Sequence, residues 1–418
     1  MTIAMGLALG LGATAAGALP VIPGASGFGM DTPAGRGGKV IKVTNLNASG
    51  PGSLKACIDA SGPRVCVFEV SGTIRLNRDL RIEKPYLTIA GQTAPSPGIT
   101  LRGAPLAVAN THDVLIQHLR IRVGDDANGA GGASPDNRDG LQIIAGKAPV
   151  KNVVVDHVSV SWGVDENFQL WHTGVSDITI RNSISSEALH DSIHPKGPHS
   201  MGIIVGPDIK RVTLTGNLFA HNNARNPRLK KGSETEFHNN VVYNWGNHAL
   251  DTEGDANLVG NYFKKGADTR GSCVHERAPS ALYMADNIGC GFTDSRSPTV
   301  RQSGYKPLAA RDAYDYVLTY AGARPADRDS VDQRVVNDVK SGSGRIIGSQ
   351  RQVGGWPSLA VNTRPLQLPA NPNGDDNRDG YTNLEEWLHA YAREVEQGNA
   401  GPTIPKAPTD LQVDVLYP

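Results

Sequence analysis

The stretch that decides the fold is Val153-Val154-Val155-Asp156-His157, a short apolar strand that ends in polar residues. An apolar strand followed by His or Asn recurs on both sides of it, at residues 114–118, 178–182, 214–217, 237–240 and 258–261. The closest copies lie roughly 21 to 25 residues apart, which is the period of one coil in a β-solenoid. The repeat therefore predicts a stack of short coils.

Strands this short cannot bury a core alone, whereas stacked coils bury a continuous one. An Asn at the same corner of successive coils can also hydrogen-bond to the turns above and below it. A β-sandwich would show Asn-Gly or Asp-Gly hairpin signals between its strands, and such pairs do not recur regularly here. We therefore expect an all-β fold, a single-stranded parallel β-helix over residues 27–300.

The ends of a solenoid expose an apolar cross-section and need caps. Residues 53–60 predict a short capping helix, because Ser53 is a suitable N-cap and the apolar residues that follow have helical spacing. Beyond Arg296 the strand repeat stops. We expect short C-terminal helices at 313–321 and 330–340 within an extension over 301–365, and a last helix at 383–396 within residues 366–418.

Composition and cysteine spacing bear on partners and compartment. The 41 basic and 41 acidic residues cancel, so nothing points to nucleic acid. We expect a monomer without a membrane partner. The apolar run in residues 1–26 is typical of a secretory signal, or else is a flexible tail. The local pairs Cys57/Cys66 and Cys273/Cys290 suit two short-loop disulfides in a secreted protein, the alternative being four buried thiols.

Residues 375–386 match the EF-hand calcium loop, with Gly380 at the sharp turn. The predicted oxygen ligands are Asp375, Asn377, Asp379, the Tyr381 carbonyl, Asn383 and Glu386. The flank at 369–374 contains two prolines and cannot be a helix. We therefore predict half of an EF-hand that stabilises the C-terminal helix. An acidic turn without metal is the alternative.

Two basic groups would meet if the coils stack. Residues 225–231 hold Arg225, Arg228, Lys230 and Lys231, with His221 just before them. One coil earlier, residues 194–199 include Lys196 and His199. Such clustered cations favour an anionic partner, although a solvated charge run is the alternative.

Acidic residues lie on the coils before these cations, at Asp136, Asp139, Asp156, Asp165 and Glu166. Carboxylates one coil apart would lie about 4.8 Å from each other, the spacing of neighbouring strands. Like charges at that distance bind a metal or become protonated. A calcium site beside a basic patch would suit the binding of an acidic polysaccharide.

The ordered motifs resemble the pectate lyase family of polysaccharide lyases. They are the glycine-rich opening at 27–54, Val155-Asp156-His157, the turn at 161–166, Arg225-Asn226-Pro227-Arg228 and residues 239–246. The resemblance covers residues 27 to about 387. It implies a right-handed parallel β-helix that cleaves polygalacturonate by calcium-assisted β-elimination.

By motif, the resemblance makes Arg225 the base and Asp139, Asp165 and Glu166 the Ca²⁺-binding acids. Lys196 resembles a catalytic lysine that holds the substrate carboxylate, although His199 is an alternative partner for Arg225. Arg228 and Lys230 are expected to bind substrate, together with His199 and His221.

Other functions stay open at this point. A β-helix that binds polysaccharide without cleaving it would not depend on Arg225, and a lyase could act on another uronate polymer. A hydrolase of the polygalacturonase type would need paired carboxylates and no arginine base. A pectin lyase would not need the acidic cluster. Endo or exo action and the preferred degree of methylation remain open, and we expect the loop at 124–134 to affect them.

Overall fold

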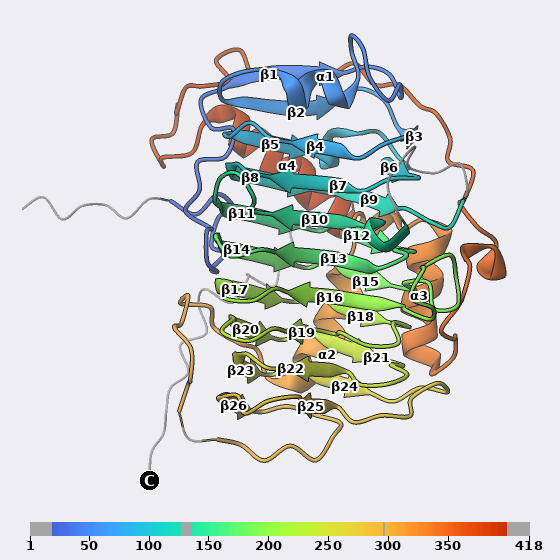
Figure 1. Cartoon of the computed structure of the whole chain (residues 1–418). Helices are drawn as coiled ribbons and strands as arrows, with labels where there is room; N and C mark the ends of the chain where they lie inside the picture. Colours follow the sequence, from blue (N-terminus) through green and yellow to red (C-terminus); the bar gives the residue numbers. More distant parts are fainter. Residues whose placement is uncertain (1–18, 127–134, 296, 399–418) are drawn as a thin grey trace, which may run out of the picture.

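The computed structural model describes residues 19–126, 135–295 and 297–398, and it is a parallel β-helix (Figure 1). Each full coil contributes one strand to each of three parallel sheets, so the sheet neighbours are mostly every third strand of the chain. Most of the predicted signal segment and much of the loop at 124–134 lie outside the described residues.

Sheet 1 is the longest and contains the motif strands. Its order is β1 (Lys39–Val43), β2 (Arg64–Phe68), β5 (Leu87–Ala90), β8 (His112–Gln117), β11 (Val150–Asp156), β14 (Val175–Arg181), β17 (Lys210–Thr215), β20 (Glu234–His238), β23 (Asp255–Val259) and β26 (Leu282–Ala285).

The other two sheets have eight strands each. Sheet 2 is β4 (Leu80–Ile82), β7 (Leu106–Ala109), β10 (Leu141–Ile144), β13 (Glu166–Trp171), β16 (Met201–Val205), β19 (Arg228–Leu229), β22 (Leu250–Thr252) and β25 (Val274–Glu276). Sheet 3 is β3 (Gly72–Arg75), β6 (Ile99–Arg102), β9 (Leu119–Arg122), β12 (Ser159–Ser161), β15 (Ile184–Ser186), β18 (Leu218–Ala220), β21 (Val241–Tyr243) and β24 (Tyr262–Lys264).

The described α-helices are α1 (Leu54–Asp59), α2 (Ala310–Tyr320), α3 (Ser330–Ser341) and α4 (Asn383–Gln397). Short 3₁₀ helices are η1 (Gly91–Thr93), η2 (Pro135–Asn137), η3 (Pro325–Asp327) and η4 (Gln350–Val353). The three predicted C-terminal helices are therefore confirmed, with small shifts at their ends.

The alternation of side chains along each strand builds the core. On β11, Val153 and Val155 point into the β-helix, while Val154 points outward and packs with Met30 of the N-terminal segment. Because side chains alternate with a period of two, one strand serves both the continuous core and an outer layer. This explains why the motif strands are apolar at consecutive positions.

Asparagines stack at one corner, as predicted. The Asn240 Oδ1 atom accepts a hydrogen bond from the Asn217 amide nitrogen Nδ2 at 3.1 Å. Asn240 Nδ2 in turn donates to Asn261 Oδ1 at 3.2 Å, and Asn261 Nδ2 donates to Asn287 Oδ1 at 2.9 Å. This buried ladder sets the register of successive coils.

A disulfide bond lies near each end of the β-helix, and a helix caps the first end. Ser53 caps α1 as predicted, its hydroxyl accepting a hydrogen bond from the backbone N–H of Ala56. Disulfides join Cys57 to Cys66 and Cys273 to Cys290, so the free-thiol alternative is wrong. One disulfide lies at α1 and β2, and the other lies beside β25 and β26 at the opposite end (Figure 1).

Helices cover two of the three flanks. Val317 of α2 and Val335 of α3 pack with Ile184 of sheet 3, and Leu388 of α4 packs with Val65 of sheet 1. Among the residues described, no helix has both the length and the apolar composition needed to cross a membrane. The predicted acids and cations lie on the flank of sheet 2, at or near the starts of its strands.

Candidate active site

The predicted acids and bases meet at the strand starts of sheet 2. Asp139 precedes β10, Glu166 begins β13 with Asp165 just before it, and Arg225 precedes β19. The strands β10, β13, β16 and β19 are neighbours in that order. Parallel strands begin at the same edge of a sheet, so residues 59 positions apart in the chain, Glu166 and Arg225, come into contact.

The three acids form a compact cluster. Carboxylate oxygens of Asp139, Asp165 and Glu166 all lie within 4.8 Å of one another. Asp139 is fully buried, accepting hydrogen bonds from the Glu166 backbone N–H at 2.8 Å and from Gln142 Nε2 at 2.6 Å. Burial raises the pKa of Asp139, and the nearby charge of Asp165 raises it further. A cluster of oxygen donors with such crowded charge suits a hard cation, and these residues fit calcium.

Arg225 lies against these acids. Its Nη1 atom contacts Glu166 Oε1 and lies 4.0 Å from Asp165 Oδ1. Burial lowers the pKa of the Arg225 guanidinium; Asp165 opposes this change, and the positive charge of Arg228 adds to it. Deprotonating this guanidinium therefore costs less free energy than deprotonating one at a solvated surface.

Arg228 and Lys230 meet a second acidic pair that the sequence did not single out. Arg228 binds Asp251 at 3.0 Å and Glu253 at 2.8 Å, while Lys230 Nζ lies 3.4 Å from Glu253. Asp251 lies on β22, 23 residues after Arg228. That separation is one coil, so extending the repeat beyond Arg228 could have located it.

The histidine-rich loop lies on the other side of Asp165. His199 Nε2 is 3.2 Å from Asp165 Oδ1, and the His194 ring stacks on the His199 ring with centroids 3.5 Å apart. Burial, together with the neighbouring His199, lowers the pKa of His194. Lys196 is exposed on the same loop, and its backbone N–H donates to His194 Nδ1. His199 therefore lies beside the acid cluster.

His221 is not brought to this cluster. It follows β18 of sheet 3, is fully buried, and its Nε2 atom lies 3.6 Å from Asp338 of α3. Its Nδ1 atom also pairs with Asn244 Nδ2 at 3.0 Å. The chain turns from sheet 3 toward sheet 2 between His221 and Arg225, so neighbours in sequence face different flanks. Its burial is incompatible with the predicted contact to substrate.

The predicted EF-hand loop comes directly before α4. Asp375 accepts hydrogen bonds from the backbone N–H groups of Asp379 at 3.1 Å and Gly380 at 3.0 Å. Asn377 contacts Glu386, and Gly380 has the left-handed φ of +93° that the sharp turn requires. Asn383 begins the helix after the N-cap Thr382. Among the described residues, Asp375, Asp379 and Glu386 do not form a group of carboxylates that all lie within 4.8 Å of one another, so a calcium ion in this loop stays a prediction.

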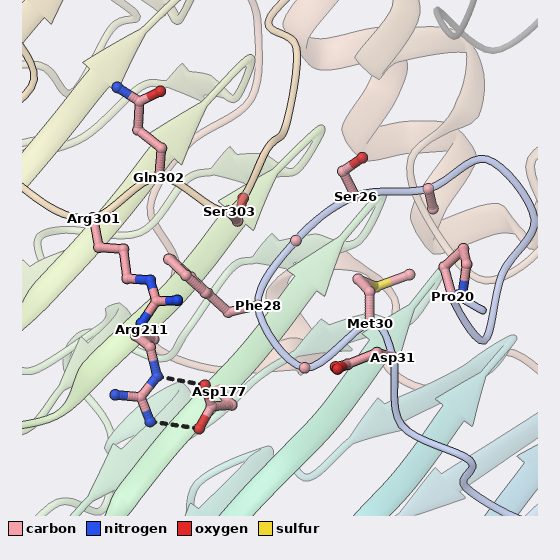
Figure 2. Close-up of a pocket in the computed structure, with 13 residues that line it drawn as sticks. Pro20, Ser26, Phe28, Met30, Asp31, Asp177, Arg211, Arg301, Gln302 and Ser303 are labelled. Carbon is pink, nitrogen blue, oxygen red and sulfur yellow. Dashed lines mark hydrogen bonds and ion pairs between the residues drawn. The ribbon is translucent and has the colours of Figure 1, made fainter. Parts of the chain in front are cut away.

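A separate cavity of about 450 Å³ lies on the outside of sheet 1, between the N-terminal segment and residues 301–303 (Figure 2). Two of its charged residues form an ion pair, with Arg211 Nη2 2.7 Å from Asp177 Oδ2. None of the predicted site residues lines it. The cavity is therefore distinct from the candidate active site on sheet 2.

A parallel β-helix with an arginine against clustered acids on one flank defines the class of β-helical enzymes that act on acidic polysaccharides. Probable pectate lyase C of Aspergillus flavus is 35% identical over 419 residues, covering 89% of this chain and 94% of the relative. The namesake in Emericella nidulans is 33% identical over 420 residues, covering 90% and 94%. No family model matches the chain.

Solved structures agree on the fold. The cedar pollen allergen jun a 1 has a TM-score of 0.51 at 20% identity, covering 70% of this chain and 91% of the allergen. A pectate lyase from Bacillus sp. N165, in complex with trigalacturonate, has a TM-score of 0.50 at 14% identity, covering 72% and 98%. With the curated relatives above, these findings establish that the chain belongs to the pectate lyase family, a family of polysaccharide lyases.

Proposed function

We propose that this protein cleaves polygalacturonate by calcium-assisted β-elimination and that Arg225 is the base. The observation that carries the proposal is the position of the Arg225 guanidinium, mostly buried and beside the cluster of Asp139, Asp165 and Glu166. Family membership supports the reaction class. The trigalacturonate bound to the Bacillus relative supports the substrate class.

The acid cluster would hold the calcium ion. Asp139, Asp165 and Glu166 offer oxygen donors only, as calcium prefers. Calcium bound there would neutralise a uronate carboxylate and make the neighbouring C5 proton more acidic. The raised pKa of Asp139 supports this role, because a buried carboxylate beside another acid needs a positive charge to stay ionised.

Arg225 would take the C5 proton. Burial and the charge of Arg228 favour a neutral guanidine, which can accept a proton on nitrogen. The electrons of the C5–H bond form the C4–C5 double bond, and the C4–O bond breaks with its electrons leaving on the glycosidic oxygen. That oxygen takes a proton from water, Arg225 returns its proton to solvent, and the new chain end is a 4,5-unsaturated uronate.

The surrounding cations would orient the chain of substrate carboxylates. Arg228 and Lys230 already bind carboxylates, those of Asp251 and Glu253, in the geometry that a uronate could use. On the histidine-rich loop, His199 lies beside Asp165 and Lys196 is exposed. His199 would be the partner of Arg225, a role that its contact with Asp165 supports, and Lys196 would hold a substrate carboxylate.

Two further assignments belong to this proposal. The pair of disulfides supports secretion into an oxidising compartment. The loop at 375–386 would bind a second calcium ion that stabilises α4, with Asp375, Asn377, Asp379, the Tyr381 carbonyl, Asn383 and Glu386 as ligands.

The test follows the ultraviolet absorbance of unsaturated product from polygalacturonate, with calcium and then with a chelator. Loss of a general base typically costs about 10²- to 10⁴-fold, so Arg225→Ala should lower kcat by this factor. Arg211→Ala is the matched control, because Arg211 pairs with Asp177 on sheet 1. Full activity in Arg225→Ala would disprove its role, and binding without any product would favour a binding protein.

A further inference from the structure

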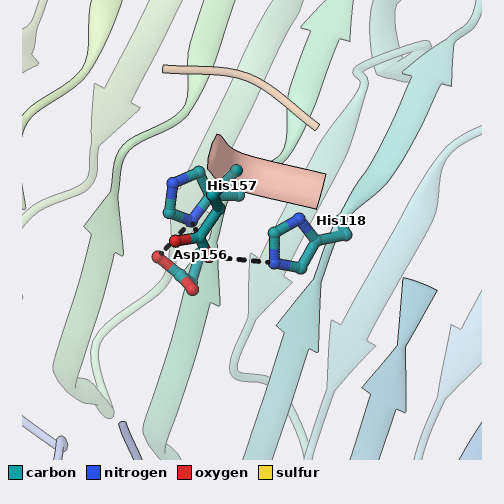
Figure 3. Close-up of side chains that lie close together, drawn as sticks. His118, Asp156 and His157 are labelled. Atoms are coloured by element: carbon teal, nitrogen blue, oxygen red, sulfur yellow. Dashed lines mark ion pairs between the residues drawn. The ribbon is translucent and has the colours of Figure 1, made fainter. Parts of the chain in front are cut away.

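A buried cluster outside the active site has no role in the proposed reaction. His118 follows β8 and His157 follows β11, so they occupy the same corner of adjacent coils. Their imidazole rings are stacked, with centroids 5.0 Å apart and planes 7° from parallel. Figure 3 shows both rings with the carboxylate of Asp156 beside them. Glu396, from the last turn of α4, completes the group.

The donor atoms of these four residues converge on one point. Glu396 Oε1 lies 3.4 Å from His118 Nε2 and 3.5 Å from His157 Nδ1. His157 Nδ1 lies 2.9 Å from Asp156 Oδ1. Ligands of a tetrahedral zinc ion, with bonds of about 2.0 to 2.1 Å, lie roughly 3.3 Å from one another. The observed separations are close to that spacing.

The tautomer of His118 leaves a lone pair facing the cluster. Its Nδ1 atom is 2.8 Å from the carbonyl oxygen of Ala323, which can only accept, so Nδ1 carries the hydrogen. In the neutral ring Nε2 is then an acceptor, and it faces the carboxylate of Glu396. A proton or a metal ion must therefore lie between this nitrogen and the carboxylate. A backbone carbonyl on the second ring nitrogen is also the usual support of a metal-binding histidine.

The polar atoms of this cluster are buried away from water. Within the described part of the chain, His118 Nε2, His157 Nδ1 and Asp156 Oδ1 are buried, and the polar groups nearest to them are one another and the Glu396 carboxylate. Arg181 is the nearest cation, with Nε 3.6 Å from Asp156 Oδ1. Two carboxylates, Asp156 and Glu396, therefore face the two imidazoles, with one fixed cation, Arg181, beside Asp156. An uncompensated buried charge is costly.

We propose that His118, His157, Asp156 and Glu396 bind one divalent transition-metal ion of the Zn²⁺ type. The mixed nitrogen and oxygen donors suit such an ion. Asp139, Asp165, Glu166 and the ligands predicted in the loop at 375–386 are oxygen donors and suit calcium. The ion joins the last turn of α4 to two coils of the β-helix. This site is independent of the proposed lyase reaction.

The experiment uses the full chain, stripped with a chelator and then refilled with calcium. Zinc is titrated by calorimetry into wild type, Glu396→Gln and His157→Gln. The matched control is His112→Gln, because His112 is a partly exposed histidine on β8. Binding is read as the difference between proteins, since Asp165, His194 and His199 also offer metal ligands. Lyase activity with calcium verifies that each variant is folded.

Wild type and His112→Gln should bind one more equivalent of zinc than Glu396→Gln, or bind it at least about 100-fold more tightly. Zinc should raise their Tm and leave that of Glu396→Gln unchanged. Cobalt bound to wild type should show the intense visible bands of a tetrahedral ion, and these should be lost in His157→Gln. Equal zinc binding and equal Tm shifts in Glu396→Gln would overturn the proposal. So would a wild type that binds no zinc at this cluster, where protons alone would then supply the charge.

Discussion

At the scale of single residues, Asp139 is the acid most dependent on a cation. It is fully buried beside Asp165 and accepts two hydrogen bonds that fix its orientation. Asp139→Asn keeps the shape but removes one charge from the cluster. Since calcium affinity follows the charge of the ligands, we expect the calcium needed for half-maximal activity to rise about tenfold or more. The measurement is lyase rate against free calcium.

Asp177→Asn is the control for that prediction, because Asp177 pairs with Arg211 on sheet 1. Its calcium dependence should match that of wild type. An unchanged calcium dependence in Asp139→Asn would exclude Asp139 as a ligand.

Individual site residues differ in how well the sequence predicts them. Asp139, Asp165, Glu166 and Arg225 were predicted from their motifs, and the structure brings them together. His221 was predicted to lie with them because it is close to Arg225 in sequence. The chain bends at the corner of the coil, so His221 lies beside Asp338 of α3 instead. Contacts such as Glu396 with His118 join distant parts of the chain, and nothing in a local pattern predicts them.

At the scale of elements, α3 is anchored to sheet 3 by buried charges. Arg122 of β9 binds Asp329 and, at 2.8 Å, Asp332, all three side chains being buried. Arg122→Met would leave both carboxylates without their main partner. Breaking a buried ion pair on one side costs about 3 to 5 kcal/mol, and we expect this loss in the free energy of unfolding by urea.

The exposed pair of Arg81 and Glu83 provides the comparison. Arg81→Met should cost about 0 to 1 kcal/mol, as surface ion pairs do. Equal losses in the two variants would mean that the Arg122 network does not hold α3.

The same network predicts a pH dependence. Burial opposes ionisation of Asp329, but Arg122 outweighs it, so the pKa of Asp329 lies below its ordinary value. A lowered folded-state pKa adds stability that is complete above the unfolded value of about 3.9 and is lost as the pH falls further. Wild type should therefore lose more unfolding free energy than Arg122→Met between about pH 5 and pH 3. A parallel decline would contradict the assignment.

The strand repeat predicted the elements well, because burial of a coil requires apolar alternation at a fixed period. The asparagine ladder from Asn217 to Asn287 was predicted for the same reason. The flank that each helix covers was not predicted. Val335 and Leu388 both lie on amphipathic helices, and only the contacts with Ile184 and Val65 show which sheet each helix covers.

At the scale of the whole molecule, the EF-hand loop should link calcium to the stability of the C-terminal segment. Calcium at about 100 times its Kd adds about 2.7 kcal/mol to a folded state that binds it. Asp375→Asn removes the first ligand and should lower the rise in Tm that calcium produces. Thermal unfolding with calcium and with chelator measures this effect.

The catalytic cluster also binds calcium in our proposal, so Asp139→Asn is measured in parallel. That variant should keep the part of the Tm rise that depends on Asp375. If Asp375→Asn responds to calcium as wild type does, the loop is an acidic turn without a structural ion.

The disulfides at the two ends have a mechanical consequence. A solenoid unfolds most readily from its ends, because a terminal coil has a neighbour on one side only. Here the disulfides Cys57–Cys66 and Cys273–Cys290 lie near the two ends of the β-helix. Each disulfide closes a loop within its own end of the β-helix, with its cysteines 9 and 17 residues apart, so it limits how far the terminal segment can extend after it detaches.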